Sequence, residues 1–292
     1  MTETEAINHY IPKLPGWADA KGLAQCHALY GLIVESRPKI SVEIGVFGGQ
    51  GLLSMLFAHR KLEQLGISGT YTVGIDPWGA EAATEGTHGE ENNAWNKSIE
   101  WEKVYRDCMQ NINDHHLMQW CRIHREKSLD VVGAFGDGAI GVMHQDGNHA
   151  EEVTAAEVEA YAPKIADKGF WVADDCDWAE GGKRTFDKAH ALLLEKGFVV
   201  ISDNYSWRIY QKNGVAPVVK AADPPLSLLA ATPDPVVEQA MQPETPITAT
   251  PEPVVEPTPP EPTVASAEVV PELEVVTPKE RPKAKKEGDK FP

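Results

Sequence analysis

Three aspartates are placed where a bound metal ion could support chemistry. Asp146 follows an apolar run with strand character, and Asp174 and Asp175 follow the next such run along the chain. If those strands are neighbours, their carboxylates meet at one edge of a sheet, where each unit of pKa shift costs about 1.4 kcal/mol. A hard divalent cation would remove the repulsion, and oxygen ligands suit Mg²⁺, Mn²⁺ or Ca²⁺. The pattern predicts a metal site at all three residues; the alternative is a helix-capping acid, a solvated acid and no metal.

His149 lies three residues after Asp146, at the mouth of the predicted metal site. A neutral imidazole there could take a proton from a substrate hydroxyl group. The alternative is a structural or exposed histidine near the start of a helix. We expect His144 to be packed in the core. Zinc is disfavoured because no set of histidines and cysteines has ligand spacing.

A glycine-rich turn is the second feature with chemical potential, and it lies within Val42–Ser54, which reads VEIGVFGGQGLLS. A short apolar run that carries Glu43 leads into Gly45 and Gly48, and an apolar run at helical spacing follows. A strand, a glycine turn and a helix bring backbone close to a ligand and direct helix N–H groups at it. The glycine spacing differs from the G-x-G-x-x-G of dinucleotide-binding proteins.

A second expected strand, Tyr71–Ile75, ends in Asp76. An acid at this position suits hydrogen bonds to ribose hydroxyls, so the turn and the acid together predict a nucleoside ligand. Trp78 could flank an adenine or line an acceptor pocket, although most tryptophans are packed in cores. Ser128 follows the third expected strand and would lie at the same edge of the sheet.

Strands that alternate with helices predict a doubly wound α/β fold with a seven-stranded, mostly parallel sheet. Ligands of such sheets bind at the carboxyl ends of the strands, where the candidate residues lie. The strands are expected at 40–44, 71–75, 121–125, 139–144 and 169–173, with a closing hairpin at 198–202 and 207–211. The helices are expected at 17–35, 52–65, 99–112, 148–161 and 183–196. The polar segment 79–97 is expected to be a mobile insertion.

Three parts of the chain are expected from these patterns. Residues 1–16 form an N-terminal arm, residues 17–213 the α/β domain, and residues 214–292 a disordered tail rich in proline and glutamate. The tail cannot bury enough apolar surface to offset its ordering entropy. The arm is either a chain end without fixed structure or a lid over a substrate site, and the tail is either solvated or a docking segment.

Composition narrows the partners and the compartment. A net charge of -17 disfavours nucleic acid and anionic membranes, since both attract positive charge. The four cysteines have no C-x-x-C pair and are expected to be reduced and mostly buried, as in a cytoplasmic protein. The sequence contains no recognisable signal peptide and no apolar stretch of membrane-spanning length. The oligomeric state stays open, a homo-oligomer included.

With these residues placed, residues 38–212 resemble the class I S-adenosylmethionine-dependent methyltransferases. VEIGVFGG is similar to that family's first motif and GIDPW to its second. HQDGNHAEE followed by GFWVADDCDW resembles the metal-dependent O-methyltransferase branch, which includes catechol-type and macrocin-type enzymes. The resemblance implies that Asp146, Asp174 and Asp175 hold Mg²⁺. It also implies that His149 is the base, as in the macrocin type.

The same resemblance implies the residues that bind S-adenosylmethionine. Asp76 would bind the ribose, Gly45 and Gly48 would approach the methionine part, and Ser128 would lie near the adenine. The remaining expected donor contacts are Glu43, Trp78 and Asp146. The chain departs from the family at Gly51, where many relatives have serine, in its Asp-Asp pair where catechol-type enzymes have Asp-Asn, and in its tail.

The expected function is S-adenosylmethionine-dependent, Mg²⁺-assisted O-methylation of a hydroxylated small molecule, such as a sugar or a glycosylated metabolite. One alternative is a metal-free methyltransferase that acts on nitrogen or on a protein side chain. Another is a non-catalytic nucleoside-binding module that recruits a partner through its tail. Metal binding discriminates the first alternative, and deletion of the tail discriminates the second.

Overall fold

A single mixed sheet organises the part of the chain that the structure describes. This is a computed structural model, and it describes residues 2–14 and 20–214. The predicted disorder of the tail lies outside the described residues, except for Gly214. The seven strands of the sheet are β1 (Ile40–Ile44), β2 (Tyr71–Ile75), β3 (Cys121–His124), β4 (Ile140–Gln145), β5 (Ile165–Ala173), β8 (Phe198–Asp203) and β9 (Arg208–Lys212).

The order of the strands is β3-β2-β1-β4-β5-β9-β8, and β9 alone among them runs antiparallel to its neighbours. The predicted doubly wound, mostly parallel sheet of seven strands is therefore confirmed. The chain order reverses between β1 and β4, which are paired in parallel. Ligands bind at such a reversal, outside the carboxyl ends of the strands.

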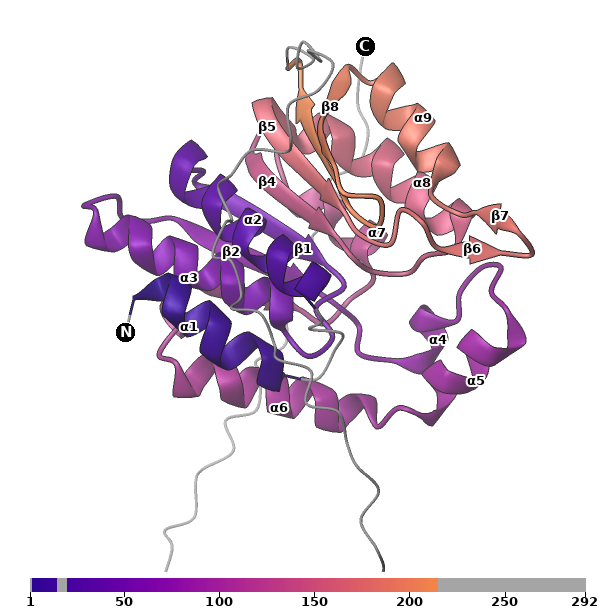
Figure 1. The fold of residues 1–292 in the computed structure, drawn as a ribbon, viewed down its shortest axis with the longest axis horizontal. Helices are drawn as coiled ribbons and strands as arrows, with labels where there is room; N and C mark the ends of the chain where they lie inside the picture. The colour runs from indigo at the N-terminus through magenta and orange to yellow at the C-terminus, as the bar shows by residue number, and fades with distance from the viewer. Residues whose placement is uncertain (1, 15–19, 215–292) are drawn as a thin grey trace, which may run out of the picture. The chain divides into compact units, whose positions relative to one another are not determined.

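Helices cover both faces of the sheet (Figure 1). The α-helices are α1 (Glu3–Tyr10), α2 (Ala20–Ser36), α3 (Gln50–Gln64), α4 (Ala80–Ala83), α5 (Glu90–Ser98), α6 (Trp101–Asp114), α7 (Ser128–Val131), α8 (Glu151–Tyr161) and α9 (Asp187–Glu195). Short 3-10 turns follow or precede several elements: η1 (Ile11–Lys13), η2 (Met118–Trp120), η3 (Val132–Ala134) and η4 (Ala162–Lys164). A small hairpin of β6 (Ala179–Glu180) and β7 (Lys183–Arg184) follows β5.

Alternation along the strands separates two cores. Val42 and Ile44 of β1 join the cluster that contains Tyr161 of α8 and Leu193 of α9. Residues of α2 and α3 pack on the opposite face, against Val142 of β4 and its neighbours. This division follows from the period of two in a strand that is buried on both faces. All four cysteines are buried and free of disulfides, as predicted.

The N-terminal segment is part of the core, which the sequence did not predict. Ile7 and Ile11 are fully buried in the cluster that includes residues of α3 and α6. Glu3 forms a salt bridge of 2.6 Å with Arg60 of α3. Helix α1 also carries a capping box, in which Thr2 and Glu5 each accept a hydrogen bond from the other's backbone N–H. Residues 2–14 are neither without structure nor a lid, since none of them lines the cavity described below.

The insertion is also more ordered than expected. Residues 80–83 and 90–98 form α4 and α5, and the Trp101 indole donates a hydrogen bond of 2.9 Å to the carbonyl of Asn96. Asn148 donates to the carbonyls of Ala82 and Glu85, at 2.9 Å each. The polar composition of this segment therefore reflects hydrogen bonds to the domain. No helix among the described residues is long and apolar enough to cross a membrane.

Replacing Ile7 with alanine tests whether α1 stabilises the domain. Because the side chain is fully buried, its loss should lower the free energy of unfolding by roughly 2–5 kcal/mol. The measurement is chemical denaturation of the full-length protein. Thr4→Ala, at an exposed position of the same helix, is the control and should change stability by about 0.5 kcal/mol or less. Equal effects of the two variants would contradict a docked helix.

Candidate active site at the carboxyl ends of the strands

A cavity of about 980 Å³ opens at the ends of β1, β2, β4 and β5. Its volume lies at the upper end of the range for sites of small molecules and cofactors, roughly 300–1,000 Å³. The sequence-predicted residues that line it are Glu43, Gly45, Gly48, Asp76, Ser128, Asp146, His149, Asp174 and Asp175. The structure thus brings all the candidates except Trp78 around one space.

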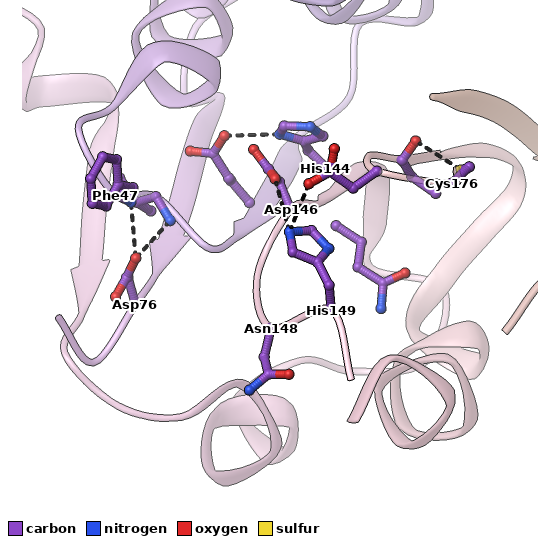
Figure 2. A network of polar contacts seen from close by, with 12 residues as sticks. Phe47, Asp76, His144, Asp146, Asn148, His149 and Cys176 are labelled. Atoms are coloured by element: carbon purple, nitrogen blue, oxygen red, sulfur yellow. Dashed lines mark hydrogen bonds and ion pairs between the residues drawn. The ribbon is translucent and has the colours of Figure 1, made fainter. Parts of the chain in front are cut away.

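Asp76 holds the glycine turn in shape. Its Oδ2 accepts hydrogen bonds from the backbone N–H groups of Val46 (3.0 Å) and Phe47 (2.9 Å), and its Oδ1 accepts one from Trp78 (2.6 Å). Figure 2 shows the Asp76 carboxylate directed at the backbone of Phe47. Burial raises the pKa of Asp76, and the three N–H groups oppose that rise. The carboxylate expected to bind ribose is therefore already engaged with the turn, and a lone pair on Oδ1 remains for a ligand hydroxyl.

Gly45 is required by the close approach of the turn to the end of β4. Its φ is +81°, and a Cβ at this position would overlap the backbone carbonyl of Asp146. A glycine is the residue that tolerates both conditions. The turn and the first predicted metal ligand are thereby held side by side.

Trp78 has a structural contact where an adenine contact was expected. Its indole N–H donates to the carbonyl of Phe47 (2.9 Å), and its ring lies edge-on to Tyr105. The side chain is buried, and it does not line the cavity. In this structure Trp78 fixes the glycine turn from behind.

Asp146 and Asp174 converge at the floor of the cavity. The carboxyl groups share a hydrogen bond, which requires a proton on one of them. Burial raises the pKa of Asp146 well above its usual range, and the negative charges of Asp174 and Asp175 raise it further. Although 35% of the Asp146 side chain is accessible, it opens into the enclosed cavity, where solvation is weak. A shared proton or a cation is what makes such a pair stable.

Histidine replaces one expected aspartate in the group that could hold a metal. One ligand atom each from His144, Asp146 and Asp174 lie within 4.8 Å of one another. Asp175 is not in this group. Its backbone is left-handed, with a φ of +48°, and its Oδ2 lies 3.2 Å from Nε2 of His149. The predicted set of three aspartates is therefore divided, with two at the floor and one beside the histidine.

His149 stands between the carboxylates and an aromatic ring. Its Nε2 lies 3.9 Å from Oδ1 of Asp146, and its imidazole stacks on Trp178 with 5.9 Å between ring centroids. Figure 2 shows His149 facing Asp146 across the cavity. Asn148, the preceding residue, is held by the insertion and also accepts a hydrogen bond from the N–H of Ala150. The histidine is thereby oriented toward the acids and remains 23% exposed to the cavity.

A buried pair beneath the floor was not foreseen as a unit. Glu43 on β1 and His144 on β4 are both about 1% exposed, and Oε1 of Glu43 lies 2.9 Å from Nδ1 of His144. A Cβ at Gly51 would overlap Oε1 of Glu43, which explains the departure from serine at this position. The sequence signal was available, since residues two apart on a strand, such as His144 and Asp146, face the same side.

Glu157 is a second acid that sequence reasoning missed. The Ser128 hydroxyl donates to its Oε1 (2.6 Å), and the Gln145 amide donates to its Oε2 (2.7 Å). The Trp171 indole donates in turn to Gln145 (3.1 Å). Burial raises the pKa of Glu157, and the two hydrogen bonds oppose the rise. The hydroxyl expected near adenine is therefore bonded to a carboxylate on α8.

Comparison with known proteins agrees with this arrangement. A family model described as a methyltransferase domain matches residues 42–176, which include the glycine turn, Asp76 and the acids of the floor. No curated protein matches the sequence. Many solved structures do match it.

Three of these structures show the likeness of fold. The O-methyltransferase NovP is 16% identical, with 65% of this chain and 80% of that chain covered and a TM-score of 0.50. The O-methyltransferase TomG from Streptomyces achromogenes, in complex with SAM, is 12% identical, with 73% and 91% covered and a TM-score of 0.48. An O-methyltransferase from Bacillus cereus, in complex with SAH, is 13% identical, with 73% and 91% covered and a TM-score of 0.47.

The sheet and the family match together define a class I methyltransferase domain. The chain is accordingly an S-adenosylmethionine-dependent methyltransferase, as its motifs predicted.

Replacing Glu157 with glutamine tests the electrostatics of the cavity wall. Because burial raises the pKa of Glu157, the folded protein binds its proton more tightly than the unfolded chain does. The unfolding free energy of the wild type therefore loses a contribution as pH rises from about 4.5 through the raised pKa. Glu157→Gln lacks this titration, so its stability relative to the wild type should increase over that window.

The measurement is chemical denaturation at a series of pH values between 4.5 and 7.5. Glu195→Gln, at an exposed glutamate on α9, is the matched control and should differ from the wild type by the same amount at every pH. A stability difference for Glu157→Gln that falls with rising pH would contradict the assignment.

Proposed function

We propose that the protein transfers the methyl group of S-adenosylmethionine to a hydroxyl oxygen of a small molecule, with the help of a divalent cation. The observation that carries the proposal is the convergence of Asp146, Asp174 and His149 in the same cavity as the glycine turn. A proton acceptor beside a cation-binding group is the arrangement that deprotonation of a hydroxyl requires. The methyl donor would occupy the side of the cavity that the turn forms.

The residues fit a divalent cation. Asp146 and Asp174 already share a site that one proton must stabilise, and His144 adds a ligand atom to the same group. When bound there, a divalent cation supplies Lewis acidity that favours ionisation of an acceptor hydroxyl. Carboxylates and the imidazole hold it, and the enclosed cavity limits competing water.

His149 would accept the acceptor's proton. Its Nε2 faces the floor, and the Asp175 carboxylate at 3.2 Å stabilises the imidazolium that results. The acceptor oxygen bonds to the methyl carbon as the carbon–sulfur bond breaks, and the electron pair of that bond stays on sulfur. Most of the acceleration then comes from positioning, because the attacking oxygen and the methyl carbon must be held in line.

The charge of the cavity narrows the acceptor. Among the described lining residues, lysine and arginine side chains are limited to Lys21 and Lys127, and Lys127 is paired with Glu85 (2.9 Å). The acids that line it are Glu43, Asp76, Glu85, Glu90, Glu91, Asp146, Glu157, Asp174, Asp175, Asp177 and Glu180. This negative field repels phosphorylated acceptors. A neutral or cationic hydroxylated molecule, such as a sugar or a glycosylated metabolite, fits the site better.

The metal dependence is tested with labelled S-adenosylmethionine and a panel of hydroxylated acceptors. EDTA and Asp174→Asn should each lower kcat/KM by about 10²-fold or more, because several kcal/mol of charge stabilisation are lost. Binding of S-adenosylmethionine, measured by calorimetry, should change by less than about threefold. Methyl transfer that persists in EDTA would favour the metal-free alternative.

The role of His149 is tested by His149→Gln. Loss of the base should lower kcat by about 10²–10⁴-fold and remove the acidic limb of the pH–rate profile. The control is His116→Asn, at an exposed histidine on the far side of α6, since asparagine tolerates its left-handed backbone. Full activity of His149→Gln at neutral pH would exclude His149 as the base.

A further inference from the structure

The imidazole of His144 has one nitrogen without a partner in a place where water cannot supply one. His144 is 1% exposed, and its Nε2 has no hydrogen bond within the described residues. A buried polar atom without a partner costs about 1–3 kcal/mol, so native proteins keep such atoms for a reason. This nitrogen belongs to the group in which His144, Asp146 and Asp174 can reach one point.

The other nitrogen shows how the ring is held. With Nδ1 2.9 Å from Oε1 of the Glu43 carboxylate, the neutral ring donates its proton there and leaves the lone pair on Nε2. Histidines that ligate metals almost always donate their second ring N–H to a carboxylate, a carbonyl or water. Glu43 and His144 reproduce that pairing on adjacent strands, and Gly51 provides the space for it.

We propose that the metal site consists of Nε2 of His144 with one carboxylate oxygen each of Asp146 and Asp174, and that Asp175 is not a ligand. This inference rests on the proposed function only for the presence of a cation. Glu43 is the positioning residue that fixes the orientation and tautomer of the imidazole.

The ligand chemistry predicts which cation binds. Mg²⁺ prefers oxygen ligands, whereas an imidazole suits transition metals such as Mn²⁺, Fe²⁺ and Co²⁺. A site with one imidazole and two carboxylates therefore selects a transition metal over Mg²⁺. The set of three aspartates predicted from the sequence would show no such preference.

The test measures Co²⁺, Mn²⁺ and Mg²⁺ binding to the full-length protein by calorimetry, without any acceptor. The wild type should bind Co²⁺ at least about tenfold more tightly than Mg²⁺. His144→Asn keeps a donor for Glu43 and removes the ligand nitrogen, so it should weaken Co²⁺ binding by more than about tenfold. Asp175→Asn is the matched variant and should bind Co²⁺ within about threefold of the wild type.

Proton NMR of the wild-type Co²⁺ complex gives a second measurement that no variant can confound. A ligating histidine should show a strongly shifted ring N–H proton that disappears in D₂O, and Glu43→Gln should move that signal. Absence of the signal, or a loss of Co²⁺ binding in Asp175→Asn that equals the loss in His144→Asn, would overturn the proposal. If the wild type binds no cation, this inference and the metal-assisted function fall together; if only the ligand assignment fails, the metal-dependent methyl transfer stands.

Discussion

Negative charge gathered at the carboxyl ends of parallel strands is the constraint to which the rest of this site is fitted. The acids lie within one enclosed cavity, where burial raises the pKa of several of them. Each buried acid has its own compensation. Asp76 has three backbone N–H groups, Glu157 has a hydroxyl and an amide, and Glu43 has an imidazole. Asp146 and Asp174 have only each other and the free nitrogen of His144, so this is the point of the fold that calls for a positive charge.

Much of this architecture could be predicted from local sequence. Apolar runs separated by helical patterns gave the parallel sheet, because strands buried on both faces are continuous and hydrophobic. The glycine turn and the acids at strand ends could be located because parallel strands all end at one edge. The boundaries of β1 and β2 agree with the predicted ranges at every residue.

Other features depend on contacts that a linear pattern does not contain. Trp78 was expected at the ligand, but its left-handed backbone and its hydrogen bond to Phe47 direct the ring into the core. Asp174 and Asp175 are adjacent, and a left-handed φ at Asp175 separates their roles. Helix α1 is too short to be convincing alone, and it is stabilised by tertiary packing through Ile7.

The hydrogen bonds from the glycine turn to Asp76 have a consequence for how a ligand meets the protein. A turn that is already tied to the end of the neighbouring strand loses little conformational freedom when a molecule settles against it. The energy of those contacts can then appear as affinity, without being consumed in ordering the backbone. Encounter should accordingly resemble entry into a rigid slot, and the adaptable part of the pocket is left to the helices of the insertion on its opposite side.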